Sequence, residues 1–127
     1  MKRDLNLVRE MMLALERDDR LNGRSTLCLY ASKLFEIPDR SDNELAYQLM
    51  LIIDEGWLVG SYNRTAGNFD VSRLTADGHD FIDATRNPDV WSKVQATMRA
   101  GGTETLRLAW DVAKSIVRSE INRHLGI

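Results

Sequence analysis

The first apolar pattern along the chain has the period of a helix. Four apolar residues recur at spacings of three and four, which predicts one apolar face of a helix over residues 3–18. They are Leu5, Val8, Met12 and Leu15. The polar run from Asp18 to Gly23 is typical of a turn and is expected to end this helix.

The next segment, Thr26–Ile37, fits two interpretations. Leu27 and Leu29 alternate with other residues as they would in a strand, but a helical stripe fits the same segment. That stripe consists of Leu27, Tyr30, Leu34 and Ile37. A helix here would begin a helix-turn-helix, whereas a strand would be the first of a small sheet. We favour a strand over Leu27–Tyr30, with a helical turn near Lys33–Phe35.

Residues 41–74 have the pattern of a helix followed by a β-hairpin. Ser41 is a good N-cap, and Glu44 completes a capping box, so a helix is expected over Asp42–Glu55. Gly56 fits the left-handed position that commonly follows a helix. The pattern then predicts a strand at Trp57–Val59, a turn or wing at Gly60–Asn68 and a partner strand at Phe69–Leu74.

Three more helices are expected after the hairpin. Each begins at a capping residue: Thr75 for residues 76–86, Asn87 with Pro88 for the second helix, and Thr103 for residues 104–125. Gly101 and Gly102 are expected to end the second of these helices. The order of elements predicts a single-domain α+β protein over residues 1–127. Its winged-helix-like core would cover residues 3–86, and its additional C-terminal helices would cover residues 87–127.

The composition of the chain predicts a cellular location but indicates no activity. The chain has 127 residues, a net charge of −2 and a single cysteine. That cysteine, Cys28, cannot form an intramolecular disulfide, which fits a reducing cytoplasm. No apolar run is long enough to span a membrane, and the N-terminus lacks the apolar core of a signal peptide. We therefore expect a cytoplasmic protein without membrane contact.

No set of residues in the sequence indicates an enzyme. His79 and Asp83 have the i, i+4 spacing of two metal ligands, but no third ligand is evident and a solvated helix face is the better interpretation. Cys28 lies in an apolar run, where a buried and inert thiol is expected. The serines and glycines match neither a nucleophile elbow nor a phosphate-binding loop. We expect no catalytic residue, no cofactor and no bound metal.

Nucleic-acid binding is the function usually associated with a winged helix, and the charge pattern disfavours it here. Asn43, Tyr47 and Gln48 would be the side chains that read base edges, and Arg64 and Arg73 would reach phosphates. However, residues 42–55 hold four acids and no Lys or Arg. Such a helix would repel the phosphate backbone. The seven basic residues of residues 86–127 outnumber their four acids, so DNA binding would need that segment and the wing.

The last helix is the better indication of function. Its apolar stripe includes Leu106, Trp110 and Val117, and Trp91 lies in the preceding helix. These four residues are candidates for an interface in a two-fold homodimer, because aromatic anchors dominate many interfaces. The alternative interpretation is that both tryptophans belong to the core of the domain.

The chain as a whole resembles a family of bacterial and phage proteins, the domain-of-unknown-function family 2513. The resemblance rests on Met1–Arg9, on Ser41–Tyr47 with Asp54–Gly56, on Arg73–Ala84, which is the most specific match, and on Trp91–Val94. This chain departs from the family pattern in Leu21–Pro38. The resemblance implies a winged-helix-like fold with additional C-terminal helices, and it implies no activity.

Together these observations predict a non-enzymatic interaction module. It would be an adaptor, or a regulator carried by a phage or mobile element, that acts through contacts with an unknown protein partner. A sequence-specific DNA-binding transcriptional regulator is the alternative, and a small enzyme is a weaker third interpretation.

Overall fold

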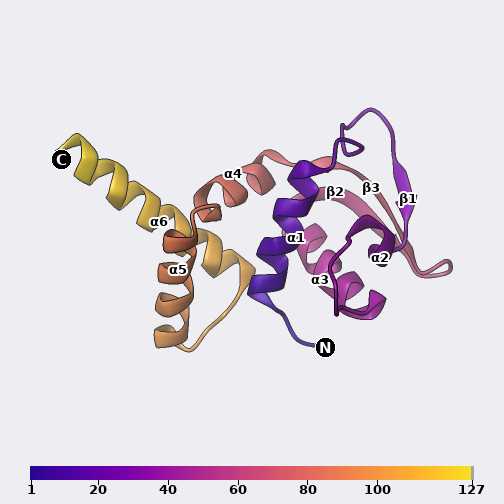
Figure 1. Ribbon diagram of the computed structural model, residues 1–127, viewed down its shortest axis with the longest axis horizontal. Coiled ribbons are helices and arrows are strands. Elements are labelled where there is room, and N and C mark those ends of the chain that lie inside the picture. Colours follow the sequence, from indigo (N-terminus) through magenta and orange to yellow (C-terminus); the bar gives the residue numbers. More distant parts are fainter. Residues whose placement is uncertain (127) are drawn as a thin grey trace. The chain divides into compact units, whose positions relative to one another are not determined.

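The computed structural model describes residues 1–126, which form a winged-helix-like α+β fold with additional C-terminal helices (Figure 1). The elements in chain order are α1 (Leu5–Arg17), β1 (Leu27–Leu29), α2 (Ala31–Leu34), α3 (Asp42–Asp54), β2 (Leu58–Asn63), β3 (Asn68–Leu74), α4 (Ala76–Thr85), α5 (Pro88–Gly101) and α6 (Leu106–Leu125). The predicted fold class is confirmed.

The chain divides into two compact units, Met1–His79 and Asp80–Ile127. This division falls inside α4, whereas the sequence pattern placed the end of the winged-helix-like core after residue 86. Whether the two units act as a single domain stays a prediction, and each unit is described separately below.

Helix α1 forms as its apolar period predicts. The Asp4 side chain caps it by accepting a hydrogen bond from the backbone N–H of Leu7 at 3.1 Å. All four residues of the predicted stripe are buried, together with Leu7 and Met11. Because this apolar face packs against α3, the two helices form much of the core of the N-terminal unit.

The ambiguous segment contains both a strand and a helix. Leu27–Leu29 forms β1, and Ala31–Leu34 forms the short helix α2, so the favoured interpretation is confirmed. The first turn of α2 is held by α3, because the carboxylate of Asp42 accepts a hydrogen bond from the Ser32 N–H at 2.8 Å. The two periods overlap in the sequence because the strand changes to a helix after a single intervening residue, Tyr30.

The sheet has three antiparallel strands in the order β1-β3-β2, with β3 in the centre. The β2–β3 register shifts between Val59 and Gly60, which leaves Ser72 without a partner on β2. The Ser72 carbonyl instead accepts a hydrogen bond from the Gly23 N–H at 3.1 Å. Strand β2 continues to Asn63, so the predicted wing of Gly60–Asn68 is wrong in length. Cross-strand pairing of Ser61 to Asn63 reduces it to a four-residue turn over residues 64–67.

The start of α4 is joined to the end of α3. The Thr75 hydroxyl accepts a hydrogen bond from the Gly78 N–H at 3.1 Å and donates one to the Gly56 carbonyl. Gly56 has a φ of 75°, as predicted for the residue that follows α3. Gly78 lies directly against the backbone of Trp57, which is buried. A single capping threonine therefore fixes both the end of α3 and the start of α4.

In the C-terminal unit, α5 packs against α6 (Figure 1), and the Lys93 ammonium pairs with the Glu120 carboxylate at 3.1 Å. Asn87 caps α5 as predicted, and Gly102, at a φ of 72°, ends it. The cap of α6 is Thr105 and not the predicted Thr103, because the Thr105 hydroxyl accepts the hydrogen bond from the Leu108 N–H at 3.0 Å. The unit is centred on Phe81, whose ring meets the rings of both Trp91 and Trp110 edge to face.

Candidate functional site

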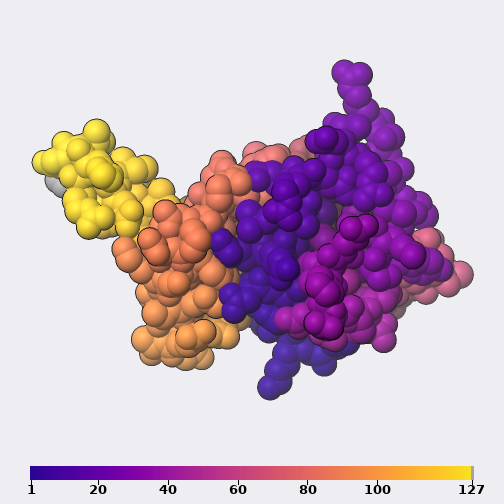
Figure 2. Space-filling model, viewed as in Figure 1, coloured from indigo at the N-terminus to yellow at the C-terminus, as the bar shows by residue number. Residues whose placement is uncertain are grey.

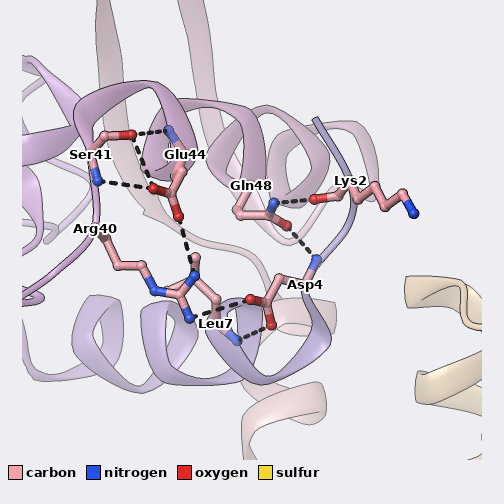
Figure 3. Close-up of polar contacts among 7 residues, drawn as sticks. All are labelled: Lys2, Asp4, Leu7, Arg40, Ser41, Glu44 and Gln48. Carbon is pink, nitrogen blue, oxygen red and sulfur yellow. Dashed lines mark hydrogen bonds and ion pairs between the residues drawn. The ribbon is translucent and has the colours of Figure 1, made fainter.

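The five predicted nucleic-acid contacts do not form one surface. On α3, Asn43 is exposed and Tyr47 is half-buried, but Gln48 is buried and 3% exposed. The prediction that Gln48 reads bases therefore conflicts with its position. Its side-chain amide donates to the Lys2 carbonyl at 2.8 Å and accepts from the Asp4 N–H at 3.0 Å (Figure 3). Gln48 holds the N-terminal segment against α3.

Arg40 joins the N-terminal ends of α1 and α3 (Figure 3). Its guanidinium lies 3.4 Å from the Asp4 carboxylate and 3.2 Å from the Glu44 carboxylate. Glu44 also completes the capping box with Ser41. The hydrogen bond from Arg40, followed by the backbone hydrogen bond from Ser41, lowers the pKa of Glu44 below its usual value.

Arg40 partly offsets the negative charge at the N-terminal end of α3. Asp42 holds α2 and Glu44 pairs with Arg40, so two of the four acids have partners at the N-terminal end of the helix. Asp54 and Glu55 lie at the opposite end. Asp4 adds a further carboxylate at the end that bears Asn43, so Arg40 offsets only part of the negative charge there, and α3 itself contains no Lys or Arg.

The Arg40–Glu44 pair predicts a pH effect. A folded-state pKa below the unfolded value stabilises the protein above the unfolded pKa, and this stabilisation is lost as the pH falls through the folded pKa. We expect the melting temperature to fall between about pH 5 and pH 3, and to fall less in an Arg40→Met variant. Lys33→Met is the matched control, and an identical pH profile for Arg40→Met and wild type would contradict the prediction.

Arg64 and Arg73 lie at opposite ends of the β2–β3 hairpin. Arg64 is exposed in the turn, whereas Arg73 lies near the end of β3, about 20 Å away along a strand of this length. The Arg73 guanidinium donates to the Leu74 carbonyl at 3.1 Å, and its side chain covers Gly23. Only Arg64 is placed as a phosphate contact of the wing would be.

Cys28 is exposed, so the predicted buried thiol is wrong. Register explains the error, because Cys28 pairs with Asp70 on the outer face of the sheet while its apolar neighbours face the core. Asp70 raises the pKa of the Cys28 thiol, first through a hydrogen bond and also through its charge. The thiol is therefore exposed but poorly ionised near neutral pH, which is unsuitable for a nucleophile.

Asp70 is expected to control the reactivity of Cys28. Replacing Asp70 with asparagine should lower the thiol pKa and speed alkylation by iodoacetamide at pH 8 by several-fold, because only the thiolate reacts. The rate is measured by mass spectrometry of the intact protein. Asp77→Asn is the matched control, and an unchanged rate in Asp70→Asn would show that the carboxylate does not set the thiol pKa.

The four predicted interface residues have two different roles. Trp91 and Leu106 are buried, at 5% and 3% exposure, so they belong to the core of the C-terminal unit and not to a free surface. Trp110 and Val117 are half-buried and line an open groove of about 360 Å³. The predicted interface is thus divided: Trp91 and Leu106 face the core of the unit, whereas Trp110 and Val117 face the groove.

We call this feature the α4–α6 groove. Helix α4 contributes Asp80, Asp83 and Ala84, and helix α6 contributes Trp110, Lys114, Val117, Arg118 and Ile121. The Lys114 ammonium lies 4.6 Å from the centre of the Trp110 ring and pairs with Asp111 at 3.3 Å. The floor is apolar, while the rim has carboxylates on one side and cations on the other. The α4 wall was not predicted from the sequence, although the i, i+3, i+4 spacing of its residues marks one helix face.

Two further features are absent from residues 1–126. No described helix is long and apolar enough to cross a membrane. No three His, Cys, Asp or Glu side chains in this part of the chain come together as a set of metal ligands.

The chain matches a known protein family. The family described as "Hypothetical protein (DUF2513)" matches residues 2–104, which end just before α6 begins. No curated protein and no solved structure matched the chain. Because the match covers most of the sequence, including every motif that carried the resemblance, the chain belongs to the domain-of-unknown-function family 2513.

Proposed function

We propose that this protein is a non-enzymatic interaction module that acts through protein–protein contacts at the α4–α6 groove. It would serve as a cytoplasmic adaptor or as a regulator carried by a phage or mobile element. The observation that supports this proposal best is the apolar floor of the groove, where Trp110 and Val117 remain half-buried beside an exposed Ile121.

The chemistry of the groove supports a protein partner. Interfaces between proteins combine an apolar centre, often with an aromatic anchor, and a polar rim. Trp110 supplies the anchor, and Asp80, Asp83, Lys114 and Arg118 supply a rim of both signs. A surface with carboxylates on one wall is poorly suited to a phosphate backbone.

The positions of the predicted DNA-contacting residues in the N-terminal unit support DNA binding less than the sequence pattern did. Gln48 is buried, and no cation on α3 supplements Arg64. Arg73 is exposed, but it lies at the far end of the hairpin from Arg64 and donates to the Leu74 carbonyl. We therefore expect weak binding of a mixed-sequence duplex at physiological salt, measured by fluorescence anisotropy. Tight binding that weakens in Arg64→Ala would favour the DNA-binding alternative.

Site-specific photocrosslinking tests the proposed function directly. A p-benzoylphenylalanine at position 121, introduced into the protein in its native host cells, is expected to form a covalent adduct with a protein. The same probe at position 119 is the control, since Ser119 is exposed on α6 but does not line the groove. The adduct should disappear when Val117 is also replaced by glutamate. Equal yields at positions 119 and 121, or no adduct at position 121, would overturn the proposal.

A further inference from the structure

We infer that the partner in the α4–α6 groove is a second copy of this chain, and that the two copies pair through antiparallel α6 helices. This inference rests on the proposed function and names its partner. Each copy would place the last turns of its α6 helix in the groove of the other.

The burial pattern along α6 leaves part of its apolar face uncovered. Leu106, Ala109 and Ala113 are buried, and none of the described α6 residues after Ala113 is. Yet apolar residues continue along the helix, with Ile121 at 51% and Leu125 at 66% exposure. In Figure 2 the last turns of α6, in yellow, stand clear of the orange atoms of α5. The sequence of α6 thus carries an apolar face for longer than its own unit can cover.

The two walls of the groove carry opposite charges at the rim. Asp80 and Asp83 lie on the α4 wall, and Lys114 and Arg118 lie on the α6 wall. A two-fold rotation brings the basic α6 wall of one copy toward the acidic α4 wall of the other. A groove that carries both signs on opposite walls is therefore complementary to itself, which is what an isologous dimer requires.

Val117 is placed where a two-fold axis between two α6 helices would pass. It lies near the middle of the apolar face that runs from Trp110 to Leu125. In an antiparallel pair centred there, Val117 meets its own counterpart, and Leu125 of each copy reaches the level of Trp110 in the other. A contact of four or five helical turns is smaller than a standard interface, so we expect micromolar and not nanomolar dissociation.

Charge substitution at the centre tests this arrangement in the full-length protein. Sedimentation equilibrium over about 1 to 100 μM should show a monomer–dimer equilibrium for the wild type. Val117→Lys and Val117→Glu should each weaken the dimer by tenfold or more, because like charges would face each other across the two-fold axis. An equal mixture of the two variants should restore association, which requires position 117 to meet itself.

The controls separate the possible failures. Ser119→Lys should leave the dimer unchanged, and circular dichroism should show that all variants remain folded. A monomeric wild type, or variants at position 117 that dimerise as the wild type does, would overturn the inference. If the wild type is monomeric but the photoprobe at position 121 still captures a different protein, the proposed function holds and only the second copy is excluded. Failure of both experiments would overturn both proposals.

Discussion

Replacing Gly78 with alanine is expected to destabilise the N-terminal unit by about 3 kcal/mol, although alanine is the better helix former. An added Cβ would overlap the carbonyl oxygen of Trp57 and lie 3.1 Å from its carbonyl carbon. That oxygen accepts the Thr75 N–H at 3.0 Å, and the Trp57 side chain is 1% exposed. Because the obstacle is buried backbone and not a flexible side chain, α4 would have to move away from the end of α3. Urea denaturation followed by circular dichroism measures the loss.

Gly101 supplies the matched control for this prediction. It is also a helical glycine, but a Cβ there would meet nothing within 4 Å. Gly101→Ala is therefore expected to stabilise the protein by up to about 1 kcal/mol through helix propensity alone. Opposite signs for the same chemical change would establish that close approach, and not helix propensity, determines the need for Gly78. Destabilisation below about 0.5 kcal/mol in Gly78→Ala would contradict the close packing at Trp57.

The parts of the fold that were predicted correctly are those set by local chemistry. Ser41 with Glu44, Asn87 before Pro88, and Gly56 each satisfy backbone groups within four residues of themselves. Such signals need no knowledge of the rest of the chain. For the same reason, two nearby residues of the same type are hard to separate. Thr103 and Thr105 are equivalent as caps, and the choice of Thr105 accompanies the burial of Leu106.

The parts that could not be predicted depend on distant partners. The apolar residues around Cys28 in the sequence predicted a buried thiol, but strand register places Cys28 opposite Asp70 and outside the core. Gln48 was predicted to contact bases, but its side-chain amide is hydrogen-bonded to the backbone of residues 2–4. The length of the wing depended on whether residues 61–63 pair with β3, which turn residues alone do not determine. In each case, a contact across 40 or more residues or a cross-strand pairing decided the outcome.

The candidate site shows the same division between local and distant information. The sequence identified Trp110 and Val117 through the period of α6, but this period does not reveal which residues of the helix its own unit covers. Trp91 and Trp110 therefore looked equivalent. In the structure both rings meet Phe81, at centroid distances of 6.3 and 6.4 Å, yet only Trp110 lines the groove. Separating the two tryptophans requires the packing of α4 against α6.

Alanine substitutions of Trp91 and Trp110 are expected to distinguish a core residue from an interface residue by their effects on stability. Trp91→Ala should lower the free energy of unfolding of the C-terminal unit by about 3 to 5 kcal/mol, because it removes a buried indole from beside Phe81. Trp110→Ala should cost about 2 kcal/mol, since the ring is half-buried and loses the contact with Lys114 as well. Thermal unfolding by circular dichroism measures both.

Protein concentration makes this comparison diagnostic. Unfolding should be measured below the dissociation constant of the proposed dimer, where association adds no stability. At higher concentration the wild type should gain melting temperature and Trp110→Ala should not, because the variant lacks the groove floor that the second copy would contact. Phe at each position retains a ring and should reduce both losses. If Trp110→Ala were as destabilising as Trp91→Ala at every concentration, Trp110 would belong to the core and the groove would lack its anchor.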